Sequence, residues 1–153
     1  MEKPLLLLSI AYLLGACSPQ SDRVSLDLMP APAGWVPDRS SCSVTGSWEL
    51  EVTPEWAERR QFWGEWLAGD TPATGAKAVM VAVDVAADLE PEAYTLSIRT
   101  DGIRIEASTE AGAFHALTTL RSLALTSDGA LPCGVISDAP RFEHRGLLLY
   151  VQL

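Results

Sequence analysis

The sequence predicts an α+β domain, in which an antiparallel or mixed β-sheet carries two helices on one face. Apolar and other residues alternate, as they do in strands, in four segments: 42–52, 78–87, 94–99 and 103–107. Segments 54–67 and 110–125 instead repeat apolar residues at helical spacing. The composition, 48% hydrophobic and 20% charged residues, is that of a globular protein.

The strand expected at 42–52 has one apolar side, as a half-buried strand does. Its apolar residues are Val44, Trp48, Leu50 and Val52. A helix follows to about Leu67, because Thr53 offers an N-cap oxygen, Pro54 suits the first turn and Gly69 ends the apolar pattern.

Tryptophans mark one side of this helix at Trp56, Trp63 and Trp66. An indole face can cover the apolar face of a sugar ring, so a glycan-stacking surface is one interpretation. Apolar residues at helical spacing usually form the side that faces the core. We therefore expect the three tryptophans to belong to the core, with sugar stacking as the alternative.

Segment 78–87 is expected to be a central strand covered on both sides. Its two faces are Val79, Val81, Val83 and Val85 on one side, and Met80 and Ala82 on the other. The clearest local signal comes next, because the Asp101-Gly102 pair joins segments 94–99 and 103–107 as a hairpin turn does.

The second helix is expected from about Glu110 to Leu125, with Ser108 or Thr109 as its N-cap. Its apolar stripe consists of Ala113, Ala116, Leu117, Leu120, Leu123 and Ala124. Phe114 is expected to widen this stripe toward the sheet. A short strand is expected at 134–136.

The last stretch of the chain resembles a known domain junction. Gly146 opens a run from Leu147 to Val151 with the pattern of a strand buried on both faces. From Asp138 to Leu149 the sequence reads Asp-x-Pro-Arg-Phe-x-x-Arg-Gly-Leu-Leu-Leu. This pattern resembles the junction in family 20 glycoside hydrolases, the β-N-acetylhexosaminidases, between an N-terminal α/β domain and the first strand of a (β/α)8 catalytic barrel. The Leu-Met-Pro-Ala-Pro stretch at 28–32 and the Ala-Gly-Ala-Phe stretch at 111–114 resemble the same family.

Residues 1–16 have the features of a cleaved export signal. Lys3 precedes an apolar run, Leu5 to Leu14, which is too short to cross a bilayer core of about 30 Å. The Leu-Gly-Ala-Cys sequence at 14–17 resembles the lipobox of bacterial lipoproteins, in which Cys17 would be acylated. A plain secretory signal with an incidental cysteine is the alternative. Ser18 resembles the signal for outer-membrane sorting in Gram-negative bacteria, so we expect an exported, membrane-anchored lipoprotein of the outer membrane or periplasm.

Four segments result from these resemblances. They are a lipoprotein signal at 1–16, a tether at 17–25, a hexosaminidase-like N-terminal domain at 26–139, and the start of a truncated catalytic barrel at 140–153. A complete barrel takes about 250 residues. We therefore expect the 153-residue sequence to hold only a stub of the first barrel strand.

The family resemblance implies hydrolysis of terminal N-acetylhexosamine from glycans, with the substrate's own acetamido oxygen as nucleophile. In an adjacent Asp-Glu pair of the family, the Asp orients and stabilises the acetamido group, and the Glu acts as general acid and then as general base. The sequence contains no such pair, so we expect the chain alone to be inactive. Arg145 matches the family's arginine that binds hydroxyls of the terminal sugar, and its guanidinium donates in a fixed fork. The alternative role is an ion pair with a carboxylate such as Asp138. Tyr150 departs from the family, which usually has Asp there.

An alternative function is a non-catalytic surface lipoprotein that acts as a docking or glycan-binding module. The net charge of -9 argues against a nucleic-acid partner, because phosphates would be repelled. The resemblance implies no cofactor. The histidines His115 and His144 do not form a zinc-site spacing with the cysteines, and we expect His115 to have a packing or capping role.

Export permits a disulfide between Cys42 and Cys133, because exported compartments are oxidising. Two free thiols are the alternative. Thiol titration of the oxidised, folded protein distinguishes the two.

Overall fold

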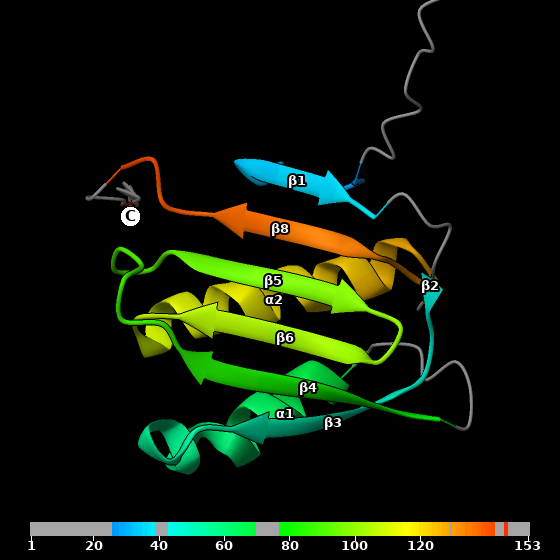
Figure 1. Ribbon diagram of the computed structural model, residues 1–153, viewed down its shortest axis with the longest axis horizontal. Helices are drawn as coiled ribbons and strands as arrows, with labels where there is room; N and C mark the ends of the chain where they lie inside the picture. The colour runs from blue at the N-terminus through cyan, green and yellow to red at the C-terminus, as the bar shows by residue number, and fades with distance from the viewer. Residues whose placement is uncertain (1–25, 39–42, 70–76, 129, 143–145, 147–153) are drawn as a thin grey trace, which may run out of the picture.

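The computed structural model describes residues 26–38, 43–69, 77–128, 130–142 and 146. These residues form an open, mixed six-stranded sheet with both helices behind it in the view of Figure 1, so the predicted fold class is confirmed. The expected barrel strand at 147–151 lies outside the described residues. No helix among those described is both long and apolar enough to cross a membrane.

The sheet has the strand order β1-β8-β5-β6-β4-β3. These strands are β1 (Gly34–Pro37), β3 (Ser47–Val52), β4 (Ala78–Val85), β5 (Tyr94–Arg99), β6 (Gly102–Ala107) and β8 (Gly134–Asp138). A separate antiparallel pair joins β2 (Ser43–Val44) to β7 (Leu131–Pro132). The helices are the 3-10 helix η1 (Pro54–Arg59), α1 (Arg60–Ala68) and α2 (Glu110–Thr126).

Two crossover connections place both helices on one face. β3, β4 and β6 run parallel to one another, and β8 runs the same way as β6 because both are antiparallel to β5. The connections β3–α1–β4 and β6–α2–β8 therefore step in the same direction across the sheet. Crossovers of the usual right hand that step the same way put their helices on the same side.

The core lies between this covered face and the helices. The predicted α2 stripe is buried throughout, and Ala113, Ala116, Leu117 and Leu120 have no exposed surface. Opposite them on the sheet, Leu96 and Ile105 are also fully buried. No polar or charged side chain is buried in the described part of the chain, so burial of apolar surface is the main stabilising contribution.

The prediction that the 78–87 strand is covered on both sides is wrong. Val79, Val81 and Val83 face the helices and are buried, but Met80 is 38% exposed on the open face. Val85, expected on the buried face, is 42% exposed at the strand end. The reason is the crossover geometry, which leaves one side of the sheet without helices.

The first helix differs from the single helix expected at 54–67. It starts as η1, and Trp56 leaves helical geometry with φ -115° and ψ 18° before α1 begins. This departure accompanies burial of the Trp56 indole, which is only 7% exposed. Thr53 occupies the N-cap position, but its hydroxyl makes no capping hydrogen bond, so that part of the prediction is wrong.

The second helix follows the prediction more closely. The Gly112 backbone N–H donates to Thr109 Oγ1 over 3.2 Å, which confirms Thr109 as the N-cap. Phe114 does not face the sheet as expected. Its ring stacks on Phe62 of α1, with 6.0 Å between the ring centroids, so it fills the space between the two helices.

The short strand β1 was not expected, whereas the strand expected at 134–136 is present as β8. β1 pairs antiparallel with β8, with Gly34 opposite Ser137. The strand expected at 42–52 is interrupted at Gly46, where an added Cβ would lie 2.3 Å from the Lys77 carbonyl oxygen. Cys133, next to β7, is disulfide-bonded. Its expected partner, Cys42, lies outside the described residues.

Two helical glycines allow a matched test of helix packing. Gly64→Ala should raise the free energy of unfolding by about 0.5–1 kcal/mol, because a Cβ there meets no atom within 4 Å and alanine favours helix. Gly112→Ala should lower it by about 1–3 kcal/mol, because the Cβ would lie 2.6 Å from the Ala93 carbonyl oxygen. Urea unfolding of both variants measures these changes. Equal effects of the two substitutions would contradict the close approach of α2 to the sheet.

Candidate functional site

The two site residues expected from the sequence, Cys17 and Arg145, lie outside the described residues. Asp138, the alternative partner considered for Arg145, is described. Its carboxylate Oδ1 accepts hydrogen bonds from the backbone N–H of Ala33 over 3.1 Å and of Ala139 over 3.0 Å. Asp138 therefore fastens the beginning of the domain to its end.

The tryptophans of the first helix belong mainly to the core. Trp56 and Trp63 are 7% and 2% exposed and meet edge to face at 5.9 Å, which confirms the core interpretation for these two residues. Trp66 is half-buried, and the Arg121 guanidinium lies 4.5 Å from its ring centroid. Phe114 contacts the same indole, with the ring centroids 5.5 Å apart. The surface of this helix therefore presents little open indole for sugar stacking.

A pocket of about 530 Å³, here called the junction pocket, lies where the domain begins and ends. Its lining residues are Met29, Pro30, Ala31, Glu92, Tyr94, His115, Thr118, Thr119, Asp138, Ala139, Pro140 and Arg141. The pocket thus joins the segment before β1, the start of β5, the outer side of α2 and the residues that come after β8.

Polar side chains in the junction pocket contact one another. The Tyr94 hydroxyl and Thr119 Oγ1 are 2.7 Å apart. Burial raises the pKa of Tyr94 to about 12, although the Thr119 hydrogen bond acts in the opposite direction. His115 Nε2 lies 3.5 Å from Glu92 Oε2, a contact that is an ion pair when the imidazole is protonated. These contacts resemble a structural network more than a reaction centre.

Exposed apolar residues border the junction pocket. Met29 is 98% exposed, and Phe142 is 70% exposed beside Pro91 and Pro140 in an adjoining hollow. Exposed apolar side chains mark an interaction surface where they form a contiguous patch, whereas single ones are normal on a protein surface. Met29 lines the pocket itself, and Phe142 lies near the end of the described domain.

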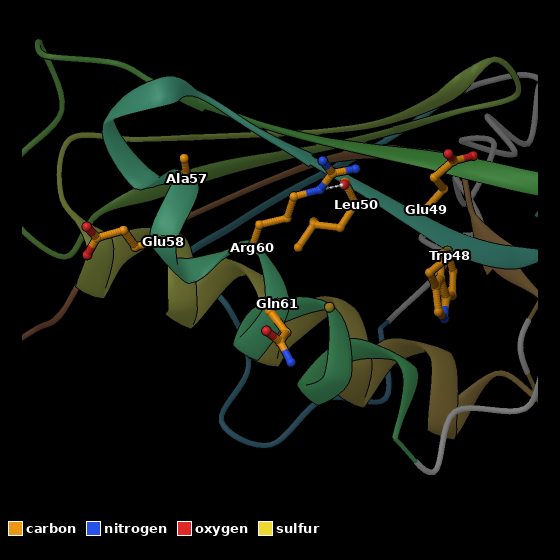
Figure 2. A pocket seen from close by; sticks show the side chains of 8 residues that line it. Trp48, Glu49, Leu50, Ala57, Glu58, Arg60 and Gln61 are labelled. Atoms are coloured by element: carbon orange, nitrogen blue, oxygen red, sulfur yellow. Dashed lines mark hydrogen bonds between the residues drawn. The ribbon is translucent and has the colours of Figure 1, made fainter.

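A second hollow, of about 620 Å³, lies between the edge strand β3 and the first helix, and is here called the β3–α1 groove. Its lining residues are Trp48, Glu49, Leu50, Ala57, Glu58, Arg60, Gln61 and Gly64. Figure 2 shows Arg60 reaching from α1 to β3, where its Nε donates to the Leu50 carbonyl oxygen over 3.1 Å. Trp48 lies farther along the strand on the helix side, whereas Glu49 points to the opposite side.

Sequence reasoning did not single out this groove. It considered sugar stacking only for tryptophans at helical spacing, and it placed Trp48 on the apolar side of a strand. What makes Trp48 accessible is the position of β3 at the edge of the sheet, beside a helix with a glycine at position 64. In the described part of the chain, no group of three or more His, Cys, Asp or Glu side chains is arranged to hold a metal ion.

Comparison with known proteins gives a consistent result. A model of "Glycosyl hydrolase family 20, domain 2" matches residues 25–139. A β-hexosaminidase of Vibrio furnissii is 30% identical over 142 residues, which cover 86% of this chain and 22% of the relative. An N,N'-diacetylchitobiase of Vibrio harveyi is 35% identical over 96 residues, covering 61% of this chain and 10% of the relative.

Solved structures agree with this match. The family 20 β-N-acetylhexosaminidase of Streptomyces coelicolor has a TM-score of 0.59 at 26% identity, over 74% of this chain and 26% of that one. A mutant Streptomyces plicatus β-hexosaminidase, solved with product (GlcNAc), has a TM-score of 0.58 at 28% identity with the same coverage. The chain spans between a tenth and about a quarter of the length of these relatives.

The raised pKa of Tyr94 predicts a loss of stability in alkali. The folded state holds the phenol proton up to about pH 12, whereas the unfolded chain releases it near pH 10, so the stabilisation present below pH 10 is lost as the pH rises toward 12. Between about pH 9 and pH 11, the free energy of unfolding should fall by about 1–2 kcal/mol less in Tyr94→Phe than in the wild type. Urea unfolding at each pH measures this difference. Thr119→Val, which keeps the phenol, should retain the pH dependence. Identical pH profiles for Tyr94→Phe and the wild type would contradict this assignment.

Proposed function

Because the chain belongs to glycosyl hydrolase family 20 and carries the family's domain 2 at residues 25–139, we propose that it is the N-terminal part of an exported β-N-acetylhexosaminidase. The parent enzyme would hydrolyse terminal N-acetylhexosamine from glycans. The family match carries this proposal. The similarity to a Vibrio furnissii β-hexosaminidase over 86% of the chain supports it.

Catalysis in the parent enzyme would belong to a barrel on the C-terminal side of this domain. The sequence has no adjacent Asp-Glu pair to position the substrate's acetamido group and to transfer a proton. Arg145 would contribute one interaction, a forked hydrogen bond to hydroxyls of the terminal sugar. Binding a sugar through one arginine does not supply the acid/base chemistry, so the chain alone would be inactive.

The described domain would support the barrel through its junction surface. Met29 and Phe142 leave apolar area uncovered on either side of the junction pocket. Asp138 fixes the last residues of β8 to the segment before β1, which gives the chain a defined direction as it leaves the domain. A barrel that begins at about residue 140 would cover these side chains and take its orientation from them.

Export and membrane anchoring form a separate part of the proposal. The Leu-Gly-Ala-Cys sequence at 14–17 would direct acylation of Cys17, and residues 17–25 would then tether the domain to the membrane. One acyl chain binds a membrane only marginally, so stable anchoring requires further chains on the same residue.

The alternative of a free-standing glycan-binding module was based on the tryptophans of the first helix. Trp56 and Trp63 are buried, and Trp66 lies against Arg121, so these residues give it little support. The catalytic parent is therefore the function that we favour.

The purified chain should release no chromogenic phenol from an aryl N-acetylglucosaminide, because it lacks the acid/base pair. Its rate should equal that of an Arg145→Ala control. The DNA downstream of the Leu153 codon should continue in frame and encode a barrel with an adjacent Asp-Glu pair. Turnover above the control, or a stop codon directly after Leu153 in a verified gene, would contradict the proposal.

Acylation of Cys17 should be visible in Gram-negative cells grown with labelled palmitate. The protein should carry the label and sediment with membranes, and Cys17→Ser should lose both properties. Ser18→Ala, at the neighbouring position, should still carry the label. An unlabelled wild-type protein released into the periplasm would support the plain secretory signal instead.

A further inference from the structure

We propose that the β3–α1 groove binds a neutral glycan chain, with Trp48 as a stacking surface and Arg60 and Glu58 as partners for sugar hydroxyls. This site goes beyond the proposed function, because it lies in the domain without catalytic residues. Only the choice of an N-acetylated oligosaccharide as probe rests on that function.

The groove is large enough for a sugar ring, and one glycine keeps it open. Its volume of about 620 Å³ lies within the range of ligand sites in proteins, roughly 300–1,000 Å³. Gly64 lies inside α1, where glycine weakens a helix relative to alanine. A Cβ at this position would meet no atom within 4 Å, so close packing does not require the glycine. Its consequence is a lower wall on the helix side of the groove.

Trp48 provides an aromatic surface with a fixed position. It is half-buried on the helix side of β3, and part of its indole packs against the core. A side chain held in this way loses little further freedom when a ligand binds. The C–H groups of a pyranose carry partial positive charge and pack well against the negative face of an indole.

Arg60 and Glu58 supply donors and acceptors farther along the groove, and Arg60 lies between Glu58 and Trp48 in the view of Figure 2. Arg60 is held in place through Nε by the Leu50 carbonyl, and its terminal nitrogens make no hydrogen bond within the described chain. Glu58 is exposed and makes no ion pair with any described residue. A guanidinium that donates and a carboxylate that accepts together match the mixed donor and acceptor character of sugar hydroxyls.

Two other classes of ligand fit the groove less well. An added β-strand would need the free carbonyl groups of edge strand β3, but the Leu50 carbonyl already accepts from Arg60. A strongly anionic ligand would meet the carboxylate of Glu58 on a chain with a net charge of -9. A neutral ligand rich in hydroxyl groups avoids both conflicts.

Isothermal titration calorimetry of the purified chain with N-acetylchitohexaose tests the site. The wild type should bind saturably. Trp48→Ala should weaken binding about tenfold or more through loss of stacking. Gly64→Leu should weaken it similarly by filling the groove, and it should fold at least as well as the wild type because leucine favours helix. Phe62→Ala, which removes an aromatic ring from the side of α1 that faces Phe114, should bind as the wild type does.

No saturable binding of the wild type at millimolar sugar would overturn the proposal, as would unchanged affinity of Trp48→Ala and Gly64→Leu. Stronger binding of cellohexaose than of N-acetylchitohexaose, lost in the same two variants, would support the groove as a carbohydrate site. That result would count against N-acetylhexosamine as the glycan of the parent enzyme. The two proposals therefore fail separately.

Discussion

Both crossovers of this domain step the same way across one sheet, and most of its other properties depend on that constraint. It places α1 and α2 side by side on one face, so a single apolar layer forms between helices and sheet. The opposite face keeps exposed residues such as Met80. It also leaves β3 at the sheet edge directly beside the helix that comes after it, which is how the β3–α1 groove arises.

Local signals in the sequence predicted the parts of the fold that depend on few residues. The β5–β6 hairpin follows from alternation around the Asp101-Gly102 pair, and α2 follows from its cap at Thr109. β1 has no such signal, because Gly34–Pro37 is only four residues long and is bounded by glycine and proline. It is extended through pairing with β8, far along the chain. The kink at Trp56 is likewise a tertiary effect, since burial of the indole outweighs regular helix geometry.

The candidate sites also differ in whether a local pattern in the sequence could predict them. Helical spacing predicted correctly that Trp56 and Trp63 belong to the core, although Trp56 lies in η1 and departs from helical geometry. The groove at Trp48 could not be predicted in this way. Accessibility of that indole depends on strand order, and strand order is fixed by contacts between distant segments. The junction pocket also combines residues from both ends of the domain, and only the folded chain brings them together.

Pairing of β1 with β8 brings the two ends of the domain to the same place, since Gly34 lies opposite Ser137. Leu26 and Leu28 already pack against the core, so the chain is held to the domain from about residue 26 onward. The chain therefore enters and leaves the domain at neighbouring positions, so the segments before and after the domain start close together. If Cys17 is anchored in a membrane and a catalytic barrel follows the domain, as proposed, residues 17–25 would set the height of that barrel above the lipid, on the order of 30 Å when fully extended. An enzyme held at that height would act on glycans close to the cell surface and would have little access to those deeper in the medium.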